Sequence, residues 1–298
     1  MKLKPLAGLL GMLLVTSPAY ALTEVDTELQ LLMDVSGSVS SSEFNLQLQG
    51  YVDAFYSQDV QSAILDTSGG KLGSIAVQMI MWSSSNQQSL MTDWFHLYDM
   101  TSINNFAATL DALVRPYAGM TAPGSAMAFG AQQFDTNNFT AARQVMDVSG
   151  DGIQNNGLDT STVRDQLLAS GIDTINGITI GQDYADGVLQ EWYVENVAGG
   201  QDAFVINATT FADFGNALEL KLAAEIEGGI IPEGALAAPI EEIPLAAQLL
   251  LGMPLLLAWR YQRRNQGRLL QANWQHVWRW YSPDSCPQKG VVIRLQTG

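Results

Sequence analysis

The sequence predicts an α/β fold: a doubly wound, mostly parallel sheet with one antiparallel edge strand and helices on both faces. Two observations predict it. From Glu28 onward, short apolar segments alternate with amphipathic helical segments, a pattern typical of a parallel sheet covered on both sides. Only one pair of apolar segments is joined by a short turn, whereas the others need helical crossovers.

The expected strands are the short apolar segments. In chain order they are Leu29–Met33, Ser74–Trp82, Gln88–Thr92, Gln144–Val148, Thr174–Ile180 and Ala203–Ile206. The turn between the second and third contains Ser-Ser-Ser-Asn, which predicts a hairpin with the third strand antiparallel at the edge.

The expected helices alternate with these strands, and several open with Ser, Thr or Asp at a cap position. They are Ser42–Tyr56, Ser102–Val114, Ser125–Phe134, Thr160–Ala169, Ala185–Val197 and Phe211–Ile226. Together these elements define one α/β domain over residues 22–228.

The composition fits a globular protein with an acidic body. The chain has 298 residues, of which 47% are hydrophobic, enough for a sizeable core. Leu22–Glu242 carries 29 acidic and five basic residues, whereas Ile243–Gly298 carries seven basic and one acidic. Because the acidic body repels phosphate backbones, we expect no nucleic-acid partner; divalent cations and cationic surfaces remain suitable.

The first residues predict export. Lys2 and Lys4 precede an apolar run, Leu6–Val15, and Ala19-Tyr20-Ala21 forms a cleavage site, so residues 1–21 are interpreted as a signal peptide. Ten apolar residues are too few to span a bilayer. The single cysteine, Cys286, allows no intramolecular disulfide, so the exported domain must depend on its core and on a metal if one binds.

The carboxyl-terminal part changes in character. Residues 229–242 are rich in Gly, Pro and Ala and are interpreted as a linker. Residues 243–264 combine an uncharged apolar stretch with an Arg cluster, which favours a membrane anchor with its basic end in the cytoplasm. A buried or amphipathic helix is the alternative, because Gln248 and Pro254 interrupt the stretch. Residues 265–298 contain no interpretable motif.

Five oxygen-bearing residues follow strand ends or precede helices in the way that a metal site requires. Asp34, Ser36 and Ser38 lie in "DVSGSVS" directly after a predicted strand, Thr121 precedes a predicted helix, and Asp151 follows another strand. In a doubly wound sheet, such loops meet beyond the carboxyl ends of the strands. Carboxylate and hydroxyl oxygens suit a divalent cation such as Mg²⁺, which would make the burial of Asp34 tolerable.

Two alternatives remain open from the residues alone. Asp and Ser in a turn also cap helices by bonding the local backbone. Asp147 competes with Asp151 as the second carboxylate; by alternation Asp147 lies within the sheet, whereas Asp151 lies in the exit loop, so we assign the ligand to Asp151.

The pattern Asp-x-Ser-x-Ser, followed by a distant Thr and a distant Asp, resembles the metal-ion-dependent adhesion site (MIDAS) of von Willebrand factor A domains. The resemblance covers about Glu24 to Glu227, and "DVSGDGIQNNG" is similar to a bacterial subgroup of secreted domains of unknown function. It implies that Asp34, Ser36, Ser38, Thr121 and Asp151 hold Mg²⁺, or Mn²⁺ or Ca²⁺. It also implies that an acidic side chain of a partner protein completes the coordination, in an adhesion or protein-binding role.

Catalysis and a purely structural metal are the competing functions. A metal-dependent hydrolase needs a base beside the site, and the two histidines, His96 and His276, belong to no such pattern, so we expect no enzyme. A cation that only ties the loops together uses the same ligands and stays open as an alternative.

A second resemblance concerns the end of the chain. The phrase Ile-Pro-Leu-Ala-Ala, an apolar helix and the Arg cluster are similar to the PEP-CTERM and VPLPA sorting signals of Gram-negative bacteria, although 34 residues follow Arg264. The resemblance implies processing at the membrane and delivery to the cell surface or matrix. We therefore expect a protein of the periplasm, cell surface or extracellular space, with a membrane anchor as the alternative to sorting.

Overall fold

The structure is a computed structural model that describes residues 21–181, 187–229 and 291–294. Its strands are β1 (Thr23–Asp34), β2 (Ile75–Trp82), β3 (Gln88–Leu90), β4 (Phe95–Leu97), β5 (Phe139–Gly150), β6 (Thr174–Ile180), β7 (Gly199–Gly200), β8 (Phe204–Ala208) and β9 (Val291–Arg294). Its α-helices are α1 (Ser41–Tyr56), α2 (Gln58–Ile64), α3 (Met100–Asp111), α4 (Pro123–Phe134), α5 (Thr160–Ser170), α6 (Val188–Asn196) and α7 (Phe214–Glu227).

The described strands form one sheet in the order β3-β2-β1-β5-β6-β8-β9. All neighbours along this order are parallel except β3, which is antiparallel to β2. Two further short strands are antiparallel as well, since β4 pairs with β2 and β7 pairs with β6. The predicted fold class is therefore confirmed, with β4 and β7 added to the predicted antiparallel edge strand.

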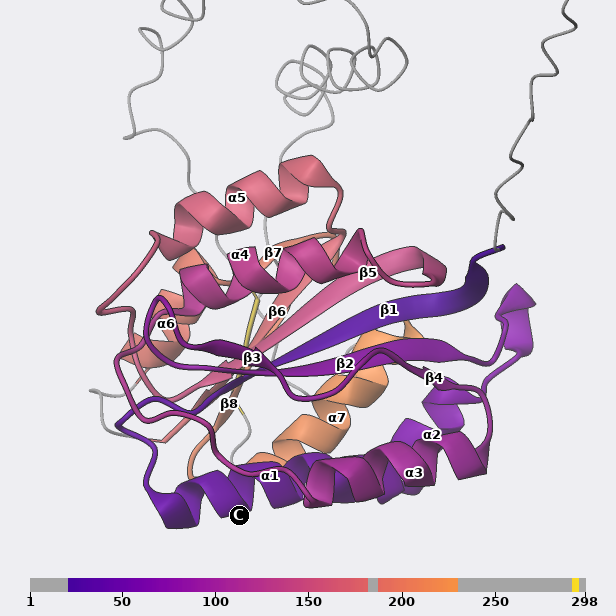
Figure 1. Ribbon diagram of the computed structural model, residues 1–298, viewed down its shortest axis with the longest axis horizontal. Coiled ribbons are helices and arrows are strands. Elements are labelled where there is room, and N and C mark those ends of the chain that lie inside the picture. Colours follow the sequence, from indigo (N-terminus) through magenta and orange to yellow (C-terminus); the bar gives the residue numbers. More distant parts are fainter. Residues whose placement is uncertain (1–20, 182–186, 230–290, 295–298) are drawn as a thin grey trace, which may run out of the picture.

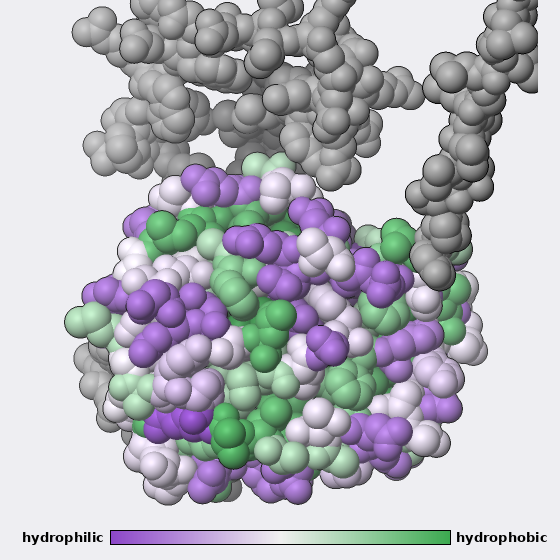
Figure 2. All heavy atoms as spheres, in the orientation of Figure 1, coloured by the Kyte–Doolittle hydropathy of each residue, from purple (hydrophilic) through white to green (hydrophobic). Residues whose placement is uncertain are grey.

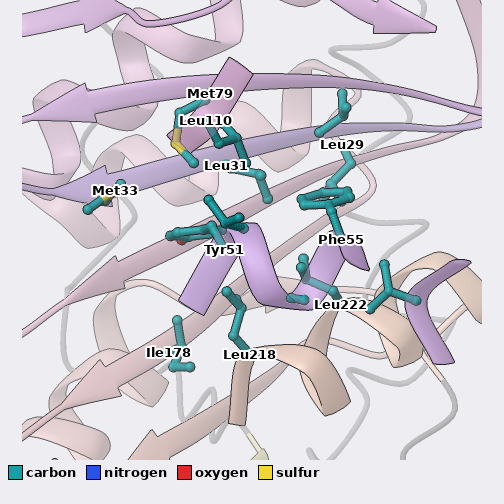
Figure 3. Close-up of a cluster of buried hydrophobic side chains, with 14 of the residues drawn as sticks. Leu29, Leu31, Met33, Tyr51, Phe55, Met79, Leu110, Ile178, Leu218 and Leu222 are labelled. Carbon is teal, nitrogen blue, oxygen red and sulfur yellow. The ribbon is translucent and has the colours of Figure 1, made fainter. Parts of the chain in front are cut away.

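Helices cover both faces of the sheet (Figure 1), and each face has its own hydrophobic core. Helices α1, α2, α3 and α7 pack on one face and α4, α5 and α6 on the other. Figure 3 shows the first core, where Leu31 of β1 and Met79 of β2 belong to the same buried cluster as Tyr51 of α1 and Leu218 of α7. Burial of each such side chain contributes about 1.5–3 kcal/mol, so these two cores supply most of the stabilisation.

In the view of Figure 2, hydrophilic and hydrophobic residues are interspersed on the outer surface, in contrast to the two buried cores. Among the described residues, no helix is long and apolar enough to cross a membrane. The predicted signal peptide at residues 1–21, except Ala21, and the predicted anchor at 243–264 lie outside the described residues.

The structure extends or adds elements where the sequence carries a weak signal. β1 and β5 begin at Thr23 and Phe139, several residues before their predicted starts, because their polar first halves pair with each other. Helix α2, with seven residues, and strand β4, with three, are too short to show a period. The start of the predicted helix Ala185–Val197 lies partly outside the described residues, and α6 begins at Val188.

A buried charge cluster joins α7 to the centre of the sheet. The Lys221 ammonium lies 2.7 Å from Oδ1 of Asp147 and also bonds Glu225, and all three side chains are fully buried. Asn176 donates to Oε1 of Glu225 at 2.8 Å. Burial raises the pKa of Asp147 and raises the pKa of Glu225 to about 7, and the Lys221 charge opposes both shifts. A single lysine therefore compensates two buried carboxyl groups.

Replacement of this lysine should be strongly destabilising. Lys221→Met keeps the volume but removes the counter-charge, and we expect a loss of about 3–5 kcal/mol in the free energy of unfolding, measured by chemical denaturation at pH 8. The loss should shrink at pH 5, because the raised pKa values let protons neutralise the carboxylates. Lys71→Met, which removes a partly exposed pair with Asp66, serves as the control and should cost less than about 1 kcal/mol. A Lys221→Met protein as stable as the wild type would contradict this account.

Candidate metal centre

The loop after β1 begins with a buried carboxylate. Asp34 is the last residue of β1, aligned with Trp82 at the end of β2, and its side chain is fully buried. The backbone N–H of Ser36 donates to Oδ1 of Asp34 at 2.7 Å. Oδ2 has no hydrogen-bond partner among the described residues. A buried carboxylate oxygen without a donor is costly, so this loop needs a further positive group or a proton.

The two serines of the loop are not helix caps. The N-cap of α1 is Ser40, whose side chain accepts from the N–H of Glu43, while the Glu43 carboxylate accepts from the N–H of Ser40. The hydroxyls of Ser36 and Ser38 instead lie 3.1 Å apart. Ser36 is buried and Ser38 is exposed, so the pair connects the inside of the site to its surface.

The second carboxylate comes from the loop after β5. Asp151 directly follows Gly150, the last residue of β5, and its Oδ1 accepts from the Ser38 hydroxyl at 2.7 Å. The structure therefore connects four of the five predicted site residues, Asp34, Ser36, Ser38 and Asp151, through side-chain or backbone hydrogen bonds.

Thr121 belongs to the loop before α4 and is buried. This loop touches the first one, because the N–H of Gly37 donates to the carbonyl of Gly119 at 2.7 Å. A Cβ on Gly37 would lie 3.1 Å from that carbonyl oxygen, so the absence of a side chain permits the close approach. The three loops thus meet at the carboxyl ends of β1 and β5, on the left in Figure 1.

The electrostatics of the site favour a cation. Burial, and then repulsion by Asp151, raise the pKa of Asp34 from 3.8 to about 8, and hydrogen bonds from Ser36 and from the backbone of Asp151 oppose the shift only in part. The oxygen atoms available as metal ligands belong to carboxylate and hydroxyl groups, which suit a hard divalent cation such as Mg²⁺. Among the described residues, no three His, Cys, Asp or Glu side chains cluster as a metal site, so any cation here depends on the hydroxyl groups.

Arg115 is a contributor that the sequence did not reveal. Its guanidinium donates to the carbonyls of Ser36 at 2.6 Å, Tyr117 at 2.8 Å and Val35 at 3.0 Å. It therefore fixes the backbone of the first loop and not the Asp34 carboxylate. An isolated arginine in a loop belongs to no motif, so its role depends on contacts visible only in the fold.

Two other candidates lie away from the site. Asp147 is inside β5 and pairs with Lys221, as described above. His96 lies in β4 opposite Ala76, six residues before the Trp82 that aligns with Asp34. At about 3.3 Å per residue this separates it by about 20 Å along the strand from the carboxyl end of β2. His276 is outside the described residues.

One solved protein, represented by two structures, shares this fold. Two structures of proximal thread matrix protein 1 from the mussel byssus, one of them with a zinc-occupied MIDAS motif, each have a TM-score of 0.50 and 15% identity. Each match covers 72% of this chain and 50% of the mussel chain, so the chain spans half the length of that protein. A von Willebrand factor type A structure from Catenulispora acidiphila has a TM-score of 0.48 and 15% identity, over 69% of this chain and 43% of that chain.

At this identity the likeness to the mussel protein shows the fold alone. Residues 24–230 match the family described as a protein of unknown function, DUF1194, and the chain belongs to that family. No curated protein matches the sequence.

The raised pKa of Asp34 predicts pH-dependent cation binding. Below about pH 8 the metal-free carboxyl group holds a proton that a cation must displace, so the affinity for Mg²⁺ should rise about tenfold per pH unit and level off above about pH 8.

Because this pKa is raised in the folded state, the metal-free protein should also lose stability as the pH rises from about 4 to about 8.

Calorimetry at pH 7, in two buffers of different ionisation enthalpy, measures the protons released per cation. We expect nearly one. An affinity that is constant from pH 6 to pH 8, with no proton release, would contradict a cation that displaces a proton from Asp34.

Proposed function

We propose that this protein is an exported, non-catalytic binding domain of the von Willebrand factor A type. In this proposal Asp34, Ser36, Ser38, Thr121 and Asp151 hold a divalent cation, Mg²⁺ in the first place and Mn²⁺ or Ca²⁺ as alternatives. The observation that carries the proposal is the buried Asp34 oxygen without a donor, beside a second carboxylate and a pair of hydroxyls that reach the surface.

When bound, the cation would offer a coordination position to an acidic side chain of a partner protein. The five side chains would contribute two kinds of ligand. Asp34 and Asp151 supply the negative charge, and the hydroxyls of Ser36, Ser38 and Thr121 supply neutral oxygens. Since the set contains only two carboxylates, it neutralises a divalent cation without excess and leaves it able to attract a third. The exposed position of Ser38 puts this attraction at the surface.

A purely structural cation is supported less well, because the protein already ties its three loops together. Gly37 bonds Gly119, Ser38 bonds Asp151, and the N–H of Thr121 donates to Asn155 at 2.9 Å. A hydrolase is also supported less well, because the nearest described histidine, His96, belongs to the opposite end of the sheet.

Location and tethering are part of the proposal and depend on the sequence alone. Residues 1–21 would direct export, and residues 243–264 would anchor the chain in a membrane or act as a sorting signal. A binding domain held at the periplasm or cell surface would meet partner proteins from outside or from the envelope.

The proposal is tested by titrating Mg²⁺ into the purified protein and its Asp34→Asn variant by calorimetry. We expect one site in the wild type and at least a hundredfold loss in the variant, with the fold kept, because asparagine preserves the shape but cannot offer a carboxylate to the cation. Asp165→Asn removes an exposed carboxylate on α5 and should bind like the wild type. Equal affinity in Asp34→Asn would refute the metal centre.

A carboxylate probe separates the binding role from a structural one. Acetate added to the Mn²⁺-loaded protein should displace water and lower the water-proton relaxation rate. Mn²⁺ binding with a relaxation rate that does not respond to saturating acetate would favour the structural cation.

A further inference from the structure

We propose that Asn155 is a positioning residue that holds Thr121 in place for the cation; this inference rests on the proposed metal centre. Asn155 belongs to the "QNNG" part of the loop after β5, four residues beyond Asp151. Asn155 lies in the same loop as Asp151, but it contacts the loop before α4, which carries Thr121.

Asn155 and its neighbour bond both polar groups of the Thr121 backbone. The N–H of Thr121 donates to Oδ1 of Asn155 at 2.9 Å. The carbonyl of Thr121 accepts from the N–H of Asn155 at 3.0 Å and from that of Asn156 at 3.2 Å. Asn155 thus hydrogen-bonds the Thr121 backbone through both its side chain and its own backbone. These bonds fix the peptide groups on either side of the Thr121 Cα atom and, with them, the direction of its Cα–Cβ bond.

The loop that carries Thr121 is held by hydrogen bonds to residues of other loops. The N–H groups of Gly119 and Met120 donate to the hydroxyls of Ser83 at 2.7 Å and Ser84 at 2.8 Å, in the β2–β3 hairpin. The N–H of Ala122 donates to the carbonyl of Ser83 at 3.1 Å. Four consecutive N–H groups, those of residues 119–122, therefore bond acceptors in other loops, and Asn155 provides the side-chain acceptor for Thr121 itself.

A glycine two residues after Asn155 lets the backbone adopt the turn that this contact requires. Gly157 has a φ of +79°, and a Cβ there would collide with the Ser125 hydroxyl of α4. Glycine lets the loop turn back against the start of α4, so that Asn155 reaches Thr121 while Asn156 accepts from the N–H of Ser85 at 2.7 Å. The segment 151–156 thereby supplies one candidate ligand, Asp151, and positions another, Thr121.

The matched pair of asparagines makes the test specific. Asn155→Ala removes the acceptor of Thr121, whereas Asn156→Ala removes a bond of similar length to the hairpin and keeps its own backbone bond to Thr121. In calorimetric titrations of the full chain, Asn155→Ala should weaken Mg²⁺ binding about tenfold and Asn156→Ala less than about threefold. Asn155→Asp retains the acceptor oxygen and should bind at least as tightly as the wild type.

A double-mutant cycle shows whether Asn155 acts through Thr121. In a Thr121→Val background, where the hydroxyl is already absent, Asn155→Ala should change the affinity less than about twofold. The inference is overturned by wild-type affinity in Asn155→Ala, by an equal tenfold loss in the Thr121→Val background, or by equal losses in Asn155→Ala and Asn155→Asp. A wild-type protein that binds no Mg²⁺ would instead remove the proposed function and this inference together.

Discussion

The fully buried carboxylate of Asp34 is the constraint on which the rest of the site depends. The adjacent strand β5 presents the same problem at Asp147, which is equally buried, but there the fold supplies its own cation in Lys221. No described ion pair includes Asp34; its pKa is raised to about 8, and its second oxygen has no donor among the described residues. The molecule therefore balances one buried aspartate internally, whereas in the proposed function a bound cation balances the other.

This division matches the architecture. The two hydrophobic cores fix the strands, and the strand ends carry the loops to one edge of the sheet. There the stabilising contacts are polar and cross from loop to loop, as between Gly37 and Gly119 or Ser38 and Asp151. A site held by such contacts is largely formed before any ligand arrives, so the ordering cost of binding is small.

The sequence was informative wherever the signal was local. Alternating apolar and amphipathic segments predicted the fold class, and strand alternation correctly placed Asp147 inside the sheet and Asp151 in the exit loop. Where contacts join distant segments, the sequence was silent: nothing in its pattern indicates that Arg115 fixes the carbonyls of the first loop or that Asn155 grips Thr121. Short elements such as α2 and β4 were missed because seven or three residues show no period.

The central claim is that a divalent cation binds at the carboxyl end of β1. Crystals of the protein soaked with Mn²⁺ and measured at a wavelength where manganese scatters anomalously would locate the ion directly. The account predicts one strong anomalous peak within coordination or water-bridging distance of Asp34, Ser36 and Ser38. A peak elsewhere, or none at a Mn²⁺ concentration that saturates the protein in solution, would contradict it.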